Sequence, residues 1–307
     1  MSEPTVLLEG VAKAFGRQMA VSEVDLAVEP GTCVGLVGHN GAGKSTMIKM
    51  MLGLLRPTAG RVRVLGEDPA SRSAANVRLA LGYLPENVAL HPSMTGLETL
   101  AFYARLKRQP VARNPELLER VGLAHAAGRR VGTYSKGMRQ RLGLAQALLG
   151  SPRAMLLDEP TSGLDPELRQ SFYDIIADLR DEGASVLLSS HALAELEGRV
   201  DRVVVMNQGR KVADGTIHEL RRLAGIRPRV RLRLDGGLRA MANGPPLWQG
   251  WSQPARGMLE AECDEDEIAS LLQCLPPGSQ DVEVIRPSLD DIYAEFLRHR
   301  AAPGETA

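Results

Sequence analysis

The 307-residue chain lacks paired cysteines and lacks an excess of charge of either sign. Its three cysteines, Cys33, Cys263 and Cys274, form no CxxC pair and no ligand-spaced cluster with histidine. Neither a disulfide framework nor a zinc site is therefore indicated, and we expect a reducing, cytosolic setting. Because 37 basic residues balance 37 acidic ones, no overall field would attract the chain to nucleic acid or to an anionic membrane.

The chain also lacks long hydrophobic runs. No segment approaches the roughly 18 consecutive apolar residues that a membrane-spanning helix needs. The first residues, MSEPTVLLEG, contain no basic segment followed by an apolar one, so no targeting segment is expected. Any work at a membrane must then be done through another protein. With 44% hydrophobic residues, the chain can bury one large domain and a smaller one.

Four short runs rich in Val and Leu predict the buried strands of a parallel sheet. They lie at residues 33–38, 154–158, 185–190 and 202–206. Helical patterns follow the first three, at residues 45–55, 166–181 and 192–198. This alternation is typical of an α/β fold. The N-terminal stretches TVLLEGVAKAF, MAVSEVDLAV and GRVRVLG predict antiparallel strands beside that core.

A helical segment interrupts the sheet pattern over about residues 87–150, where Thr95 and Glu98 stand at capping-box spacing. The pattern resets near residues 225–228. We therefore expect a first domain over residues 1–224 and a small α+β domain over residues 228–302. One hypothesis gives the small domain a dimer-stabilising or regulatory role.

The strand predicted at residues 229–234 alternates Arg with Val and Leu. Such a strand could bind nucleic acid, but no aromatic side chains interleave with the arginines, so we favour a half-exposed strand with a solvated face. Trp248 and Trp251 are expected to cover the small core of this domain rather than to stack on bases. No nucleic-acid partner is expected.

The stretch GHNGAGKST fits the pattern G-x-x-x-x-G-K-[ST] between a predicted strand and a predicted helix. Its glycines let backbone N–H groups point at phosphate oxygens, and the helix N-terminus adds its positive end. Lys44 would reach the terminal phosphates and Ser45 would ligate Mg²⁺. The candidate site comprises Gly38, His39, Asn40, Gly41, Ala42, Gly43, Lys44, Ser45 and Thr46.

Two further strands end in polar side chains that suit the same site. Asp158 follows the strand AMLL, where a carboxylate can hold the metal, and the adjacent Glu159 is a candidate general base for the attacking water. His191 ends the next strand, SVLLSS. A single histidine is often structural, but at this edge of the sheet it can donate to the γ-phosphate and respond to its loss.

These motifs, together with YSKGMRQR and SGLD, resemble in order and spacing the ATP-binding subunits of ATP-binding-cassette (ABC) transporters, over about residues 5–222. The resemblance implies a P-loop ATPase fold and a head-to-tail homodimer with ATP and Mg²⁺ as cofactors. Ser135, Lys136 and Gly137 would complete the partner's site, Asp165 would lie in the loop that couples the two sites, and Phe15 would stack on adenine. A buried, purely structural Phe15 remains the alternative.

The sequence departs from the family pattern at two places. The signature has Tyr134, Lys136 and Met138 at its variable positions, and Glu86 stands where relatives usually carry a glutamine that touches Mg²⁺ and faces the membrane subunit. A carboxylate at this position adds negative charge near the metal. We therefore include Glu86 among the candidate metal ligands.

Within the family, GYLPENV, the stretch around the signature and PSLDDIYAEFL resemble the ATPase subunits of nitrous oxide reductase maturation transporters. That resemblance implies a polytopic inner-membrane permease, a periplasmic accessory protein and a place on the cytoplasmic face of the bacterial inner membrane. The ATPase of a drug or antibiotic exporter remains an alternative. A soluble cassette protein acting on ribosomes or DNA fits less well, because neither a second cassette nor a long coiled coil is present.

Overall fold

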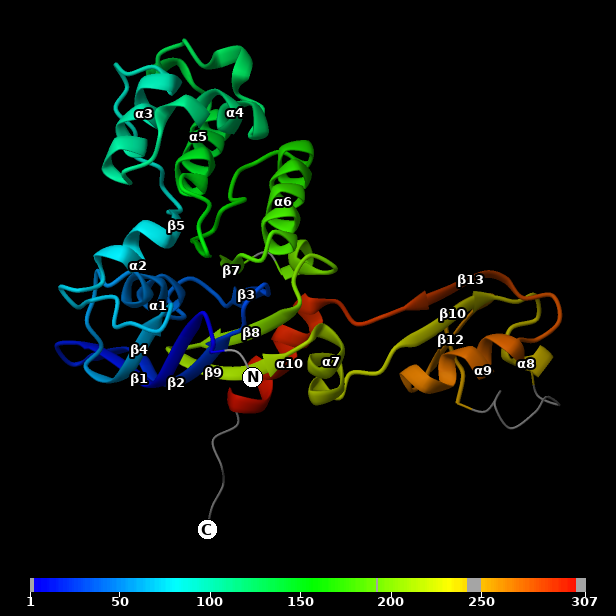
Figure 1. Ribbon diagram of the computed structural model, residues 1–307. Helices are drawn as coiled ribbons and strands as arrows, with labels where there is room; N and C mark the ends of the chain where they lie inside the picture. Colours follow the sequence, from blue (N-terminus) through cyan, green and yellow to red (C-terminus); the bar gives the residue numbers. More distant parts are fainter. Residues whose placement is uncertain (1–2, 192, 242–249, 302–307) are drawn as a thin grey trace. The chain divides into compact units, whose positions relative to one another are not determined.

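The computed structural model describes residues 3–191, 193–241 and 250–301 (Figure 1). The chain divides between Thr216 and Ile217 into two compact units. The boundary predicted at residues 225–228 would assign helix α7 (Ile217–Ala224) to the first domain, whereas this division places α7 in the second unit.

The first unit is built on a six-stranded sheet with the strand order β5-β6-β7-β3-β8-β9. Its strands are β3 (Cys33–Val37), β5 (Leu81–Leu84), β6 (Ala154–Leu157), β7 (Ser185–Ser190), β8 (Arg202–Asn207) and β9 (Arg210–Gly215). All neighbours are parallel except β8 and β9. The four predicted strands are present, and β5 and β9 extend the sheet at its two edges.

A separate antiparallel sheet is formed by β1 (Val6–Phe15), β2 (Gln18–Val28) and β4 (Ala59–Val64), in the order β2-β1-β4. Inward-facing Val and Leu side chains of these strands share one core with helix α1 (Lys44–Met51) and with the middle of the parallel sheet. This sheet therefore supports the segment between β3 and α1.

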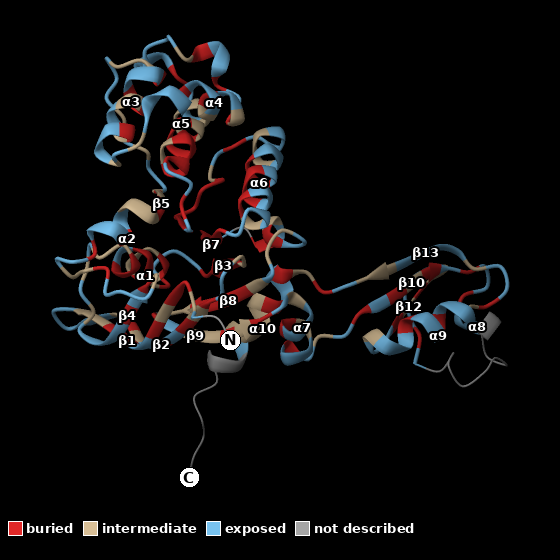
Figure 2. Ribbon diagram, viewed as in Figure 1, coloured by how far each residue is buried: buried red, intermediate tan, exposed pale blue. Residues whose placement is uncertain are grey.

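The predicted helical segment contains α3 (Gly96–Leu106), α4 (Asn114–Arg120) and α5 (Lys136–Leu148), preceded by α2 (Ala75–Ala80). The capping box at Thr95 is confirmed, since its side chain accepts from the Glu98 N–H and Glu98 accepts from the Thr95 N–H. Short 3₁₀ turns lie at Val111–Arg113, Ala124–Ala126 and Val131–Thr133. The buried residues of α5 begin at Gln140 and continue to Leu148, whereas Lys136 at its start is exposed (Figure 2).

Helix α6 (Pro166–Asp181) has the bounds that the sequence predicts, with Asp165 as its N-cap. The helix expected at residues 192–198 is instead a short 3₁₀ turn, η4 (Leu193–Leu196), and Ala192 lies outside the described residues. A turn of four residues is too short for the i→i−4 bonding that an α-helix sustains.

The second unit holds the sheet β11-β12-β10-β13 and helices at both ends of its sequence. Its remaining elements are β10 (Arg229–Arg233), α8 (Leu238–Met241), β11 (Ser252–Ala255), β12 (Met258–Glu262), η6 (Glu265–Glu267), α9 (Ile268–Gln273), β13 (Gln280–Ile285) and α10 (Leu289–Ala301). Val230, Leu232 and Trp251 belong to its core. Trp248 lies outside the described residues.

The arginines of β10 lie on the other face of this small sheet. Arg231 pairs with Glu260 at 2.9 Å and Arg233 with Asp281 at 3.1 Å. The arginines of β10 therefore form the solvated face that the alternating pattern predicts. In neither unit do the described residues include a helix with the length and apolar character that crossing a bilayer requires.

Candidate functional site

The segment between β3 and α1 forms a tight phosphate-binding turn. Gly41 and Gly43 adopt φ values of 87° and 102°, in the left-handed region that favours glycine. A Cβ atom at Gly38 would lie 2.5 Å from the Met206 carbonyl oxygen, and one at Gly43 would lie 2.6 Å from the Ala20 carbonyl oxygen. The glycines of the motif are therefore required by backbone geometry as well as by the chemistry of phosphate binding.

The predicted metal-binding side chains converge at the start of α1. Ser45 Oγ donates to Asp158 Oδ1 at 3.1 Å, and Ser189 Oγ donates to the same oxygen at 2.7 Å. Asp158 is 5% exposed. A hydroxyl and a carboxylate supply the oxygen ligands that Mg²⁺ prefers, and this ion usually keeps several water ligands. The pair fits Mg²⁺ held partly by phosphate oxygens, and no cluster of three or more metal-binding His, Cys, Asp or Glu side chains occurs in the described ranges.

Glu159 is held both by its backbone and by its side chain. Its backbone is left-handed, with φ 48°, and its N–H donates to Ser189 Oγ at 2.9 Å. One carboxylate oxygen, Oε2, bonds His191 Nδ1 at 2.6 Å. The other, Oε1, forms a 3.2 Å ion pair with Lys44 Nζ. The structure thus brings Lys44, Glu159 and His191 together, although they come from three different parts of the sequence.

A cavity of about 410 Å³ opens over this group. Most of the predicted phosphate-binding residues line it, together with Glu159 and Glu86. Gln18, Met19 and Ala20, at the start of β2, also line the cavity, and sequence reasoning missed them. The sequence offered one indication, because these residues follow Phe15 closely in the chain. A hairpin that places Phe15 at a nucleotide also places the start of the next strand there.

Phe15 ends β1 opposite Gln18 and is 48% exposed. Lys13 Nζ lies 5.3 Å from the centre of its ring. The alternative of a buried Phe15 is therefore wrong, and an exposed ring beside the cavity-lining strand can stack on a base. Phe15 itself does not line the cavity.

The signature residues do not line this cavity either. Ser135 is the N-cap of α5 and accepts from the Met138 N–H at 3.2 Å, and Asp165 caps α6 by accepting from the Leu168 N–H at 2.9 Å. Lys136 Nζ lies close to Gly163: a Cβ atom added at Gly163 would be only 2.5 Å from this nitrogen. Gly137 packs near Leu168. The N-terminal ends of α5 and α6 therefore form a second group, separate from the cavity.

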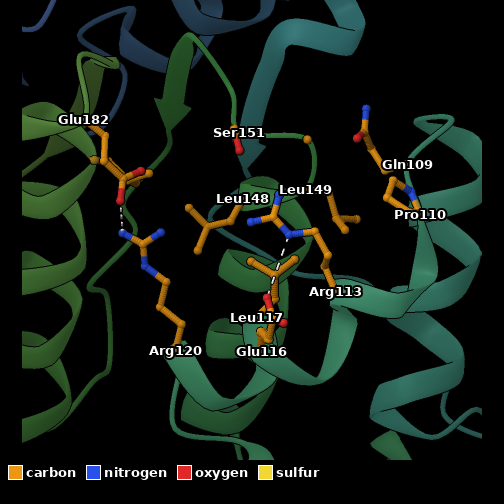
Figure 3. Close-up of a pocket in the computed structure, with 12 residues that line it drawn as sticks. Gln109, Pro110, Arg113, Glu116, Leu117, Arg120, Leu148, Leu149, Ser151 and Glu182 are labelled. Atoms are coloured by element: carbon orange, nitrogen blue, oxygen red, sulfur yellow. Dashed lines mark hydrogen bonds and ion pairs between the residues drawn. The ribbon is translucent and has the colours of Figure 1, made fainter.

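A second hollow, of about 230 Å³, lies beside α4 and the end of α5 (Figure 3). Leu117, Leu148 and Leu149 contribute to its wall, and Arg120 pairs across it with Glu182 at 2.9 Å. No predicted site residue lines this hollow. Its ion pair is partly solvated and links the helical segment to the end of α6.

A phosphate-binding loop that follows one strand of a parallel sheet, beside an Asp-Glu pair at the end of another strand of the same sheet, defines a P-loop nucleoside triphosphatase. The chain belongs to the ABC transporter family of ATP-binding proteins, whose model, described as "ABC transporter", matches residues 21–162. The activity of this family is ATP hydrolysis coupled to transport, and the domain binds ATP.

Curated relatives align over nearly the whole chain. The daunorubicin resistance ATP-binding protein DrrA3 of Streptomyces coeruleorubidus is 37% identical over 303 residues, which cover 95% of this chain and 96% of that protein. The doxorubicin resistance ATP-binding protein DrrA of Mycobacterium tuberculosis (strain H37Rv) is 34% identical, covering 94% and 92%. A solved ATP-binding subunit of an ABC transporter shares 31% identity with a TM-score of 0.67, over 72% of this chain and 93% of that one.

Proposed function

We propose that this protein is the ATP-hydrolysing subunit of an exporter for drug-like or antibiotic molecules, acting as a homodimer on a polytopic membrane subunit. The observation that carries this proposal is the alignment with drug-resistance ATP-binding proteins across both units of the chain, not over the ATPase domain alone. The Nod factor export ATP-binding protein I of a Rhizobium species, 39% identical over 72% of this chain and 73% of that protein, also bears an export name.

A role in nitrous oxide reductase maturation is the second candidate. It rests on the resemblance of three sequence stretches to the ATPase subunits of maturation transporters. The drug-resistance names of the relatives described above favour the exporter instead. Under this second candidate a periplasmic accessory protein would be an indirect partner. Six histidines and three cysteines in the whole chain offer no evident copper site, so copper chemistry would lie in other subunits.

In the proposed mechanism the phosphate-binding turn and the polar side chains beside it have separate tasks. The backbone N–H groups of residues 38–46 and the Lys44 ammonium would hold the phosphates, while Ser45 and Asp158 would hold Mg²⁺. When bound, Mg²⁺ neutralises charge that develops on the phosphoryl oxygens. Glu159 orients and deprotonates the attacking water, and the His191 ring contacts the carboxylate that does so.

The second group of residues would act on the nucleotide of a second copy. Ser135 and the N–H groups at the start of α5 present a helix N-terminus, which favours an anion. Asp165 lies at the start of α6, in a position to link the two sites of a head-to-tail dimer. Binding of ATP would close the pair and loss of the γ-phosphate would open it.

The membrane subunit would receive this motion through the segment from Glu86 to Leu106. Leu97, Phe102 and Leu106 of α3 are exposed apolar side chains in this segment, which suits a protein contact. The protein would then work at the cytoplasmic face of the bacterial inner membrane, held there by its partner.

The test is to express the chain with the membrane protein encoded beside it and to purify the complex from membranes. The proposal predicts co-purification, and it predicts that cells carrying both proteins accumulate less anthracycline than cells carrying Glu159→Gln. Equal accumulation in the two strains, together with restored assembly of the copper enzyme, would instead support the maturation role. Association with ribosomes or DNA in place of a membrane protein would contradict both.

A further inference from the structure

One buried polar side chain takes no part in the mechanism described so far. Gln140 lies on the inner face of α5 and is 4% exposed. Its side-chain Nε2 donates to the carbonyl oxygen of Pro160 at 3.0 Å, and that bond is itself buried. Pro160 directly follows Glu159. The helix that begins at the signature is therefore bonded to the loop that carries the proposed base.

The loop that receives this bond is held at three successive residues. The Glu159 N–H donates to Ser189 Oγ at 2.9 Å, the Pro160 carbonyl accepts from Gln140, and Thr161 Oγ1 donates to Glu195 Oε2 at 2.9 Å. These three anchors come from β7, α5 and η4. Arg169 of α6 pairs with the same Glu195 carboxylate at 2.9 Å.

Such anchoring is needed because Glu159 has a left-handed backbone. Its φ of 48° is unfavourable for a residue with a side chain, and surrounding bonds must maintain it. The direction of the carboxylate depends on this backbone conformation. Loss of the Gln140 bond would remove one of the three anchors of this loop, so the backbone that holds Glu159 in its left-handed conformation would be less constrained.

We propose that Gln140 is a positioning residue that holds Glu159 in its catalytic orientation and ties that orientation to the signature end of helix α5. Ser135, the N-cap of α5, and Gln140 lie on one rigid helix, about 1.4 turns apart. A shift of Ser135 on a partner's nucleotide therefore moves the donor that fixes this chain's own base. The proposal rests on the proposed roles of Glu159 and Ser135.

The test uses two substitutions of Gln140 and one control in the full chain with its membrane subunit. Gln140→Leu keeps the size but removes the donor, so the Pro160 carbonyl is left without its partner. Gln140→Glu keeps the shape, and its ionised carboxylate cannot donate. Gln146→Leu is the matched control, because Gln146 lies on the same helix, is partly buried and has no side-chain hydrogen bond in the described part of the chain.

We expect Gln140→Leu to lower kcat about ten- to a hundredfold, as a misplaced catalytic group does, while KM for ATP changes less than about twofold. Gln140→Glu should be equally slow at pH 8 and should recover as the pH falls toward 6, because a buried carboxyl with a raised pKa then regains a proton to donate. Gln140→Leu should not recover at any pH, and Gln146→Leu should match the parent.

Three results would overturn the proposal. They are a parent-like kcat in Gln140→Leu, a KM rise that accounts for the whole loss, or an identical pH profile for the Leu and Glu variants. The Glu variant keeps the test decisive if the Leu variant folds poorly. Glu159→Gln is run alongside: if that variant still hydrolyses ATP at the parent rate, the base assignment fails, whereas an inactive Glu159→Gln beside an active Gln140→Leu refutes only the role of Gln140.

Discussion

The motifs of this chain fall into two groups that the fold treats differently. In the first group, Lys44, Asp158 and Glu159 are 5–8% exposed and are bonded to one another or to neighbouring strands. In the second group, Ser135 and Lys136 are exposed at the start of α5, and Asp165 is exposed at the start of α6. The chain's own tertiary contacts fix the first group, whereas local helix capping fixes the second.

This difference indicates what each group can do. A buried, interlocked set of charges is preorganised for chemistry, because little reorganisation is needed when the substrate enters. Exposed helix N-termini are suited to a ligand that arrives from outside the chain. Substitutions in the first group should therefore abolish turnover, and substitutions in the second should weaken what a second copy contributes.

The largest effect is expected from Glu159→Gln. Removal of a general base lowers a rate by about 10²–10⁴-fold, and the variant should still bind ATP because Lys44 and the glycine turn are untouched. Turnover by phosphate release and dimer formation by light scattering, with and without ATP, would measure this. A variant that hydrolyses ATP at the parent rate would show that the first group does not hold the base.

A smaller effect, specific to the second group, is expected from Ser135→Ala. The loss of an N-cap costs about 1 kcal/mol of stability, and the loss of a hydroxyl facing the partner's phosphate should lower kcat at least about tenfold. Thr95→Ala is the matched control, because Thr95 caps α3 by the same kind of bond.

The two cap variants should show similar shifts in thermal unfolding, and only Ser135→Ala should lose ATPase activity. Equal activity in both variants would mean that Ser135 is a helix cap and nothing more. In that case the two groups of residues would differ in solvent exposure, and the second group would have no role in ATP hydrolysis.

An intermediate case is Glu86, which lines the cavity but is exposed. Glu86→Gln removes a negative charge near the proposed metal, so half-maximal ATPase activity should require a few-fold more Mg²⁺. A Mg²⁺ titration of both proteins measures this shift. If the Mg²⁺ dependence of ATPase activity and the transport by the complex are both unchanged, Glu86 is not a metal ligand.

The parallel sheet was largely predictable because its strands are continuous apolar runs. The strands at 33–37, 154–157, 185–190 and 202–207 match the predicted runs within one residue at each end. Strand β5 was missed because it has only four residues, one of them Gly82. The phosphate-binding turn was predictable for a different reason: its function constrains consecutive residues, so the whole pattern is local.

The supports of the site were not predictable in the same way. Ser189 bonds both Asp158 and Glu159 across two strands, and no local pattern pairs residues thirty positions apart. Gln140 gave one weak signal, a polar residue at helical spacing from Gly143, Leu144 and Ala147, which are all buried. Long-range hydrogen bonds of this kind become visible only once the strands and helices are placed.

The smallest effect on catalysis is expected at Lys107, which belongs to neither group. A substitution there tests whether stability can change without a change in kcat. Its Nζ donates to the carbonyl oxygens of Leu81 and Leu149, at 2.7 and 3.1 Å, and joins the helical segment to the sheet. Burial lowers the pKa of Lys107 from 10.5 to about 8. Lys107→Met should lower the free energy of unfolding by about 1–3 kcal/mol at pH 7.5, because both carbonyls lose their donor, and should leave kcat unchanged.

The lowered pKa of Lys107 also predicts how the free energy of unfolding changes with pH. Between pH 8 and 10.5 the unfolded chain keeps the Lys107 proton that the folded chain has released, so the parent's stability gains a contribution as the pH rises through this window. Below pH 8 both states are protonated and the contribution is constant. Urea unfolding at pH 7.5 and pH 10 should therefore show a larger gap between parent and Lys107→Met at pH 10. A gap that narrows would mean that the two carbonyl bonds stabilise the charged amine enough to outweigh its burial.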